Sequence, residues 1–380
     1  MNVRGERWPW IMRLAGAVVI ILNLAACGTP AEGTTVNIVG ARGQYIWAVT
    51  GSRFFVSSDA GAHWSSTAVP SGVVGTKTDA LVSPTGALWL LNTNQNIASF
   101  SYALGSGESW STTRTTLTWP GPAPKGRGAG GAILGSNGPG VVSAVVSDNN
   151  GNLAPAVLIL VSSDGKAFQE HAPPITSGDL NVAFISPTTG VVAGDQKIYY
   201  TTDGGSSWHP AVLPGADQSG AMILGIPLVS GPRIYVTASF AFGSGWRLVL
   251  YVSTNGGKSF AMSGSVTRRN PLSGTQINTN QDDNTTPGLG VDGANIWMLS
   301  APPNVNAIVY TSSDGGTDWK PVSSPQLNNS LPDIGLTSAS DATVWVTPAN
   351  CNGSACNKMM LLATSDGGRS WQRAPLPPVK

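Results

Sequence analysis

Short apolar runs alternate with polar, glycine-rich turns from about residue 33 to the end of the chain. The runs are rich in β-branched and aromatic residues, which favour strands. Six of them end at the same kind of turn: residues 54–58, 158–163, 197–202, 248–253, 307–313 and 359–365. No helical periodicity of useful length follows residue 30, so the pattern predicts an all-β chain.

The turns share an eight-residue motif, Ser/Thr-x-Asp-x-Gly-x-x-Trp. Its four clean copies begin at Ser57, Thr201, Ser312 and Thr364. Softer copies begin at three other positions: Ser253, with Asn in the Asp position and Phe in the Trp position; Ser162, one residue short and ending in Phe; and Ala103, with Gly in the Asp position.

The motif contains the chemistry of a tight hairpin turn. A short acidic side chain can accept hydrogen bonds from backbone N–H groups just ahead of it. Gly supplies a positive φ that other residues avoid, and we expect the Trp ring to fold back over the hairpin. The residues with this structural role are Asp59, Asp164, Asp203, Asn255, Asp314 and Asp366.

Other strands accompany each motif. Two apolar strands precede each run, one of which often carries an aromatic residue, and a polar strand follows the turn. Four strands per unit, repeated seven times at intervals of roughly 40 to 60 residues, predict a seven-bladed β-propeller over residues 35–380. The expected blades span residues 33–70, 74–118, 128–174, 177–214, 218–264, 285–324 and 330–377.

The motif resembles the Asp-box, or bacterial neuraminidase repeat. That repeat is found in sialidases, sortilin-type receptors, some glucan hydrolases and propellers of the photosystem II assembly factor family. The resemblance implies that each box joins the third and fourth strands of a blade at the periphery, on the face away from any active site. It therefore implies a structural role for the boxes and leaves function open.

The N-terminal segment is predicted to lie outside the propeller. Three arginines precede an apolar stretch that is too short to span a membrane comfortably and suits a signal peptide over residues 1–26. Leu24-Ala25-Ala26-Cys27 resembles a bacterial lipobox, which implies a lipidated Cys27 and a location on the outer side of a membrane. Residues 27–34 then form a tether. The alternative is an ordinary secretory signal that is cleaved nearby.

The two remaining cysteines, Cys351 and Cys356, are close enough in sequence to bridge a hairpin loop, and an exported protein permits disulfides. A metal site would need more ligands than this loop offers. The net charge of +1 gives no indication of nucleic-acid binding. We predict no cofactor and no metal.

Candidate catalytic groups are few. His63, His171 and His209 are predicted to be solvated peripheral residues, and the chain has only four Glu. A glycosidase normally needs two carboxylates beside the sugar bond, whereas sialidases use a Tyr nucleophile. The Arg-Ile-Pro signature of sialidases is absent, and the nearest string is Arg233-Ile234-Tyr235. Asp-based chemistry outside the boxes stays possible.

The face opposite the boxes is predicted to carry uneven loops, including residues 237–247 and the connection 264–285. Irregular loops on a regular scaffold often carry function. Outside the predicted signal peptide, two tryptophans, Trp119 and Trp246, are not part of the repeat, and both fall in segments predicted to lie on this face. We take them and their neighbours as the candidate partner-binding residues: Trp246, Arg247, Phe240, Phe242, Trp119, Arg268 and Arg269. The alternative is that these rings plug the bases of the loops.

The sequence predicts a non-catalytic module that binds or assembles a protein or glycan partner on the cell envelope. The alternative is a glycoside hydrolase or sialidase-like enzyme that uses the same loop-rich face.

Overall fold

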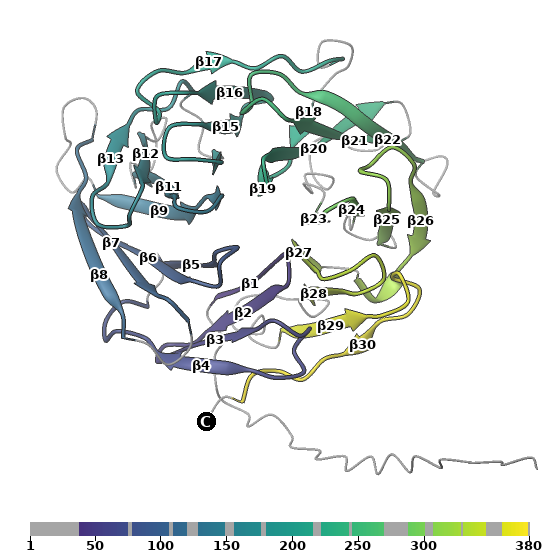
Figure 1. Cartoon of the computed structure of the whole chain (residues 1–380), viewed down its shortest axis with the longest axis horizontal. Helices are drawn as coiled ribbons and strands as arrows, with labels where there is room; N and C mark the ends of the chain where they lie inside the picture. The colour runs from purple at the N-terminus through teal and green to yellow at the C-terminus, as the bar shows by residue number, and fades with distance from the viewer. Residues whose placement is uncertain are drawn as a thin grey trace, which may run out of the picture.

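The strands form a closed ring of seven blades (Figure 1). The computed structural model describes residues 38–74, 78–105, 109–119, 128–148, 156–175, 180–215, 222–242, 245–269, 288–300, 307–327, 330–346 and 359–378. The predicted signal peptide, Cys27 with its tether, and the pair Cys351 and Cys356 lie outside these residues.

Blades 1 to 3 follow the chain in order. Blade 1 is β1 Ile38–Arg42, β2 Tyr45–Val49, β3 Arg53–Ser57 and β4 Ser65–Ala68. Blade 2 is β5 Thr78–Val82, β6 Leu88–Asn94, β7 Ile97–Ala103 and β8 Ser111–Thr116. Blade 3 is β9 Ala129–Leu134, β11 Val142–Asp148, β12 Val157–Ser162 and β13 Gln169–His171.

Blades 4 and 5 each have an additional short strand. Blade 4 is β14 Asn181–Phe184, β15 Gly190–Gly194, β16 Lys197–Thr201 and β17 His209–Pro210, with β10 Ser136–Asn137 added from the preceding blade's sequence. Blade 5 is β18 Met222–Leu224, β19 Leu228–Ser230, β20 Arg233–Phe242, β21 Gly245–Ser253 and β22 Ala261–Arg269. β18 and β19 both pair with β20.

Blades 6 and 7 share one hydrogen-bonded sheet. Blade 6 is β23 Gly288–Asp292, β24 Asn295–Ser300, β25 Ile308–Ser312 and β26 Lys320–Ser323, followed by the 3-10 turn η1 Pro325–Leu327. Blade 7 is β27 Ser330–Leu336, β28 Ala342–Val346, β29 Met360–Thr364 and β30 Gln372–Arg373. The innermost strands of the two blades meet in parallel at Leu289 and Asp333. The predicted fold and order of blades are confirmed.

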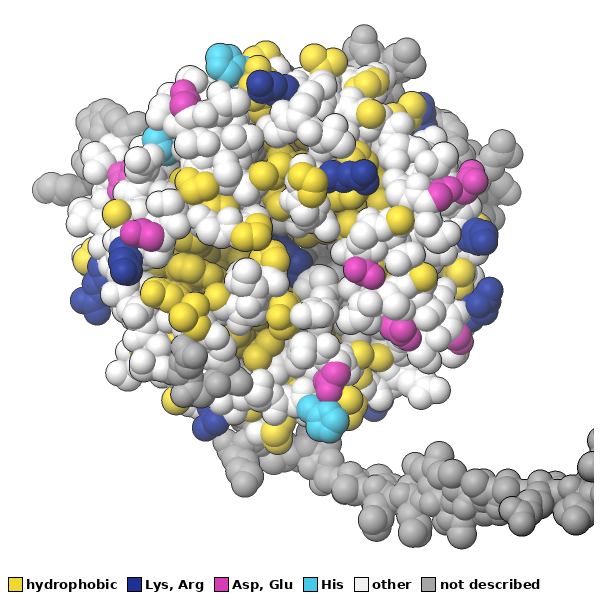
Figure 2. All heavy atoms as spheres, viewed as in Figure 1, with side chains coloured by type: hydrophobic (Ala, Val, Ile, Leu, Met, Phe, Trp, Pro, Cys, Tyr) yellow, Lys and Arg dark blue, Asp and Glu magenta, His cyan; other side chains and the backbone are white. Residues whose placement is uncertain are grey.

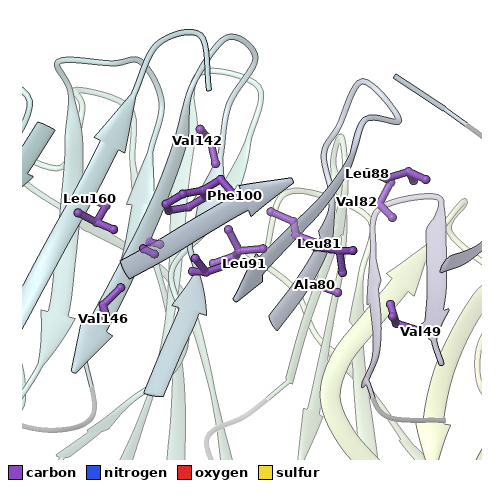
Figure 3. Close-up of a cluster of buried hydrophobic side chains, with 14 of the residues drawn as sticks. Val49, Ala80, Leu81, Val82, Leu88, Leu91, Phe100, Val142, Val146 and Leu160 are labelled. Atoms are coloured by element: carbon purple, nitrogen blue, oxygen red, sulfur yellow. The ribbon is translucent and has the colours of Figure 1, made fainter. Parts of the chain in front are cut away.

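The buried core lies between blades. Figure 3 shows one cluster, whose labelled side chains come from β2 of blade 1, β5, β6 and β7 of blade 2, and β11 and β12 of blade 3. Phe100, Leu91 and Val146 in this cluster are fully buried. Because each sheet is apolar on both faces, every blade needs a neighbour on each side, and a ring supplies both.

Blades 1 and 7 close the ring without sharing a strand. Gly43 and Gly335 form an isolated parallel bridge between the inner strands. The indole Nε1 of Trp345 donates to the carbonyl of Gly40 at 3.1 Å, and that of Trp64 donates to the carbonyl of Pro375 at 2.9 Å. Closure therefore rests on packing and a few hydrogen bonds.

The strand register defines two faces of the ring. Ile46 pairs with Ser57, and Ile234 pairs with Ser253, so the third-to-fourth strand turns of blades 1 and 5 share one face with the turns between their inner strands. We call this the box face and the other the far face. Within the described part of the chain, no helix is long and apolar enough to cross a membrane.

Candidate functional site

The Asp-box turns are clasped by two side chains. In blade 4, Thr201 Oγ1 donates to Asp203 Oδ1 at 2.8 Å and accepts from the backbone N–H of Gly205 at 2.9 Å. Asp203 Oδ1 in turn accepts from the backbone N–H of Ser207 at 2.9 Å. Asp203 thus accepts a backbone N–H within its turn, and the first Ser or Thr of the motif does the same.

A similar arrangement recurs in the five other boxes that have Asp or Asn in the acidic position. The backbone N–H four residues beyond the acidic position donates to Asp59 at 2.9 Å, to Asn255 at 3.1 Å and to Asp366 at 3.0 Å. Asp314 accepts from two successive N–H groups, as does Asp164 in the shortened box. These six residues are therefore turn acceptors.

Hydrogen bonds lower the pKa values of the Asp carboxyl groups in the five boxes that contain Asp. The pKa of Asp59 falls to about 2, chiefly because the backbone of His63 donates to its carboxylate, and that of Asp366 falls to about 2 through Ser370. The pKa values of Asp164, Asp203 and Asp314 are lowered for the same kind of reason. Donors that favour the charged form have this effect.

The box aromatics lie between blades and do more than cover their own hairpins. Phe168 of blade 3 stacks on Phe100 of blade 2 with ring centroids 3.8 Å apart. Trp110 of blade 2 donates to the carbonyl of Ala68 in blade 1 at 2.6 Å, although its box has Gly in the acidic position. In blades 2 and 3 the box aromatic therefore contacts the preceding blade.

Burial of His171 makes the stability of the propeller depend on pH. Burial lowers the pKa of this histidine below 6.5, with Asp203 acting weakly in the opposite direction. Its buried Nε2 has no hydrogen-bond partner among the described residues. A depressed histidine pKa means that the unfolded chain binds the proton more tightly, so stability falls as the pH drops below 6.5.

We expect the melting temperature to fall in two stages on acidification. The first begins below about pH 6.5 from His171, and the second begins below about pH 4, where the box carboxylates with lowered pKa values become protonated. Thermal denaturation between pH 8 and pH 2 measures both. His171→Gln should remove the first stage and keep the second; a variant that keeps both stages contradicts this assignment.

The candidate partner-binding residues gather in blade 5, with one exception. Residues 237–247, expected as a loop, belong mostly to the hairpin of β20 and β21, whose strands have 10 and 9 residues. β22, also of 9 residues, extends beside them and includes both Arg268 and Arg269, which were expected in a connection. The three strands therefore stay paired as far as the far-face end of this ribbon.

The register brings aromatic and basic positions side by side. Trp246 is paired with Arg268, and Gly245 is paired with both Phe242 and Arg269. Directly paired residues in an antiparallel sheet share one face. We call Phe242, Trp246, Arg247, Arg268 and Arg269 the blade-5 tip.

Two of the candidate residues have other roles. Phe240 is 4% exposed and packs in the core, so the expectation of an exposed ring there is wrong. Its alternation with Val236 and Ala238, both buried, explains this. Trp119 lies beyond β8 in blade 2, packs on the core and donates from Nε1 to Asn96 Oδ1 at 3.1 Å.

Arg247 lies along the ribbon. Its Nη2 is 3.3 Å from Met262 Sδ, and its charge acts on the buried Tyr251, whose pKa is raised by burial. Met262 is 43% exposed. Arg247 and Met262 thus give the outer side of blade 5 a mixed basic and apolar surface.

Two carboxylates outside the boxes accept hydrogen bonds from backbone N–H groups. Asp79 accepts from the backbone N–H of Leu134 at 2.7 Å, linking blades 2 and 3, and Asp148 accepts from that of Ala156 at 3.0 Å. Among the described residues, no three His, Cys, Asp or Glu side chains gather as a metal site. Figure 2 shows that charged side chains on one face are scattered among neutral ones.

A groove of about 490 Å³ lies on the box face between blades 1 and 7. Asp59 and Asp341 both line it, together with Arg373 and several hydroxyl groups. Asp59 is the acceptor of box 1, and Asp341 accepts from the hydroxyl of Ser338. A general acid needs a raised pKa, which is the opposite of the shift at Asp59.

Comparison with known proteins gives a similarity of fold. The model of the BNR/Asp-box repeat matches residues 199–210, the box of blade 4. No curated protein matches the chain. An uncharacterised protein of Listeria monocytogenes EGD-e is 10% identical, with coverage of 92% of this chain and 97% of that one and a TM-score of 0.52.

Two enzymes are similar at lower scores. An ancestral GH74 enzyme is 14% identical at a TM-score of 0.47, with 91% of this chain and 47% of that chain covered. The Trypanosoma rangeli sialidase is 14% identical at a TM-score of 0.39, with 76% and 46% covered. This chain thus spans about half the length of either. Together with the sheet order, the comparisons describe a seven-bladed β-propeller with Asp-box repeats.

Proposed function

We propose that this propeller is a non-catalytic binding or assembly module for a protein or glycan partner on the cell envelope. In this proposal a lipidated Cys27 holds it on the outer side of a bacterial membrane. The observation that carries the proposal is the blade-5 tip, where the register of β20, β21 and β22 aligns Trp246 with Arg268 and places Arg247, the next residue, on the other face of the ribbon. Aromatic and arginine residues are the commonest energetic anchors of binding surfaces.

The carboxylates support this role over hydrolysis. Every described carboxyl group with a resolved pKa shift is lowered, and each belongs to a box turn. Three tyrosines, Tyr235, Tyr251 and Tyr310, are buried in the core. A hydrolase of the glycosidase or sialidase kind would instead draw its acid and nucleophile from far-face Asp or Tyr residues.

We expect Trp246→Ala to weaken capture of an envelope partner at least about tenfold while the melting temperature stays within a few degrees. Pull-down from detergent-solubilised membranes measures the capture. His63→Ala, on the box face, is the control and should change nothing. Hydrolysis of sialosides or glucans by the purified protein, lost on changing one far-face Asp or Tyr, would replace this proposal with the enzyme alternative.

The anchor has its own test. Cys27→Ser should prevent lipid attachment and move the protein to the soluble fraction or leave it as an unprocessed precursor. Fractionation and mass spectrometry of the N-terminus check this. Normal processing with unchanged membrane retention in the variant would contradict lipidation at this residue.

A further inference from the structure

The far-face end of the blade-5 ribbon has an ordered sequence of residue types. Phe242 is the last described residue of β20, and Gly245 and Trp246 begin β21, so aromatic positions stand at or beside the end of the hairpin. Arg247 follows Trp246 directly, and Arg268 and Arg269 end β22. Aromatic positions thus stand at the end of the hairpin, with basic positions beside and behind them.

The two faces of the ribbon carry the same combination. Trp246 and Arg268 are direct partners and share one face. On the other face, Gly245 pairs with both Phe242 and Arg269. Arg247 belongs to that face too, because it lies two positions from Gly245 in the same strand. A partner that contacts the end of the ribbon therefore meets an aromatic and a basic position on either side.

The ribbon is positively charged as a whole. β20, β21 and β22 contain four arginines and neither Lys, Asp nor Glu, whereas the full chain has a net charge of only +1. Three of the four arginines belong to the tip. With no acidic residue in the three strands to offset them, the charge favours an anionic surface.

The chain enters the ring on the same face. Ile38 begins β1 and pairs with Val49, at the end of the blade opposite the turn between Arg42 and Tyr45. The described part of the chain therefore begins at the far face, where the blade-5 tip also lies. Ten residues separate Cys27 from Ile38, and a chain of that length reaches at most roughly 35 Å.

We propose that the blade-5 tip docks the propeller onto an anionic lipid surface. This rests on the proposed function, since it names the contact partner of the same tip and uses the same anchor. Aromatic residues favour the interface between hydrocarbon and headgroups, and arginines favour anionic headgroups. The tether and the tip together orient the far face toward the membrane.

The test compares variants of the full chain, all carrying Cys27→Ser, on two kinds of vesicle. One contains phosphatidylcholine alone, and the other contains phosphatidylcholine with about one-third phosphatidylglycerol. The tip variant is R268Q/R269Q. The matched control is K258Q/K320Q, which removes two positive charges from exposed residues, one within the blade-5 box and one directly after the blade-6 box. The N-terminal segment is common to all variants and cancels in the comparison.

We expect R268Q/R269Q to reduce partitioning onto the anionic vesicles about 30-fold, the effect of two basic residues near a charged surface. The control should change it less than about threefold. Trp246→Phe should reduce fluorescence quenching by brominated lipid, because Trp246 is the only tip tryptophan. Equal binding by tip variant and control, or binding independent of lipid charge, overturns the proposal.

Failure of membrane docking is distinguishable from failure of the binding module. If R268Q/R269Q binds vesicles normally but loses capture of an acidic protein or glycan, the lipid surface is wrong and the module stands. If the wild-type chain instead hydrolyses a glycan through a far-face residue, the module itself fails. Circular dichroism melting of each variant confirms that the comparisons are made on folded protein.

Discussion

Gly257→Ala should destabilise the propeller by about 3 kcal/mol or more. Gly257 is the second glycine of the blade-5 box and has φ +90°, a conformation that costs an L-residue about 1–2 kcal/mol. A Cβ added there would lie 2.1 Å from Cγ1 of Val191 in blade 4 and 3.3 Å from Cβ of Tyr200. Val191 is short and fully buried, so the overlap adds about 1–3 kcal/mol. Urea denaturation followed by tryptophan fluorescence measures the loss.

A matched variant separates the two causes. Gly315 in the blade-6 box also has a positive φ, +79°, but nothing lies within 4 Å of a Cβ added there. Gly315→Ala should therefore cost only the conformational part, about 1–2 kcal/mol. Equal losses in both variants would show that the second glycine is needed for its backbone angle alone and that contact with the preceding blade is irrelevant.

Thr201→Val should cost about 2 kcal/mol, with a range of about 1–3. Valine keeps the shape of the fully buried Thr201 but removes the oxygen that accepts from the backbone N–H of Gly205. That N–H then lies buried without its acceptor, and Asp203 loses a donor. Chemical denaturation provides the measurement. Thr202→Val, at the exposed next residue, is the control and should change stability by less than about 0.5 kcal/mol.

The regular part of the fold was predictable because the same motif occurs seven times in the sequence. Apolar runs, the acidic turn residue and the spacing together predicted the blades. The role of the first Ser or Thr was missed, although its position in six of the seven motifs was the available signal. β10 could not be predicted, since two polar residues, Ser136 and Asn137, become a strand only by pairing with β14 of the next blade.

The sequence identified the candidate residues of blade 5 but not the secondary structure that they adopt. The stretch TASFAFGSGWR contains Gly and Ser and was therefore expected as a loop, yet most of it pairs as a hairpin because β22 continues alongside. The pairing of Trp246 with Arg268 depends on a register shift at Leu250 and Tyr251, a tertiary feature with no sequence signal. The burial of Phe240 was predictable from the alternation of its strand.

The closure of blade 7 on blade 1 has a consequence for cooperativity. A linear array of repeats has two outer units, each with one neighbour, and unravels from them. Here Trp64 and Trp345 join the first and last units, so every unit has two neighbours and none is an end. Unfolding any single blade requires the loss of its contacts with two neighbouring blades at once. Local opening between one pair of blades is therefore opposed by the contacts between all the other pairs in the ring.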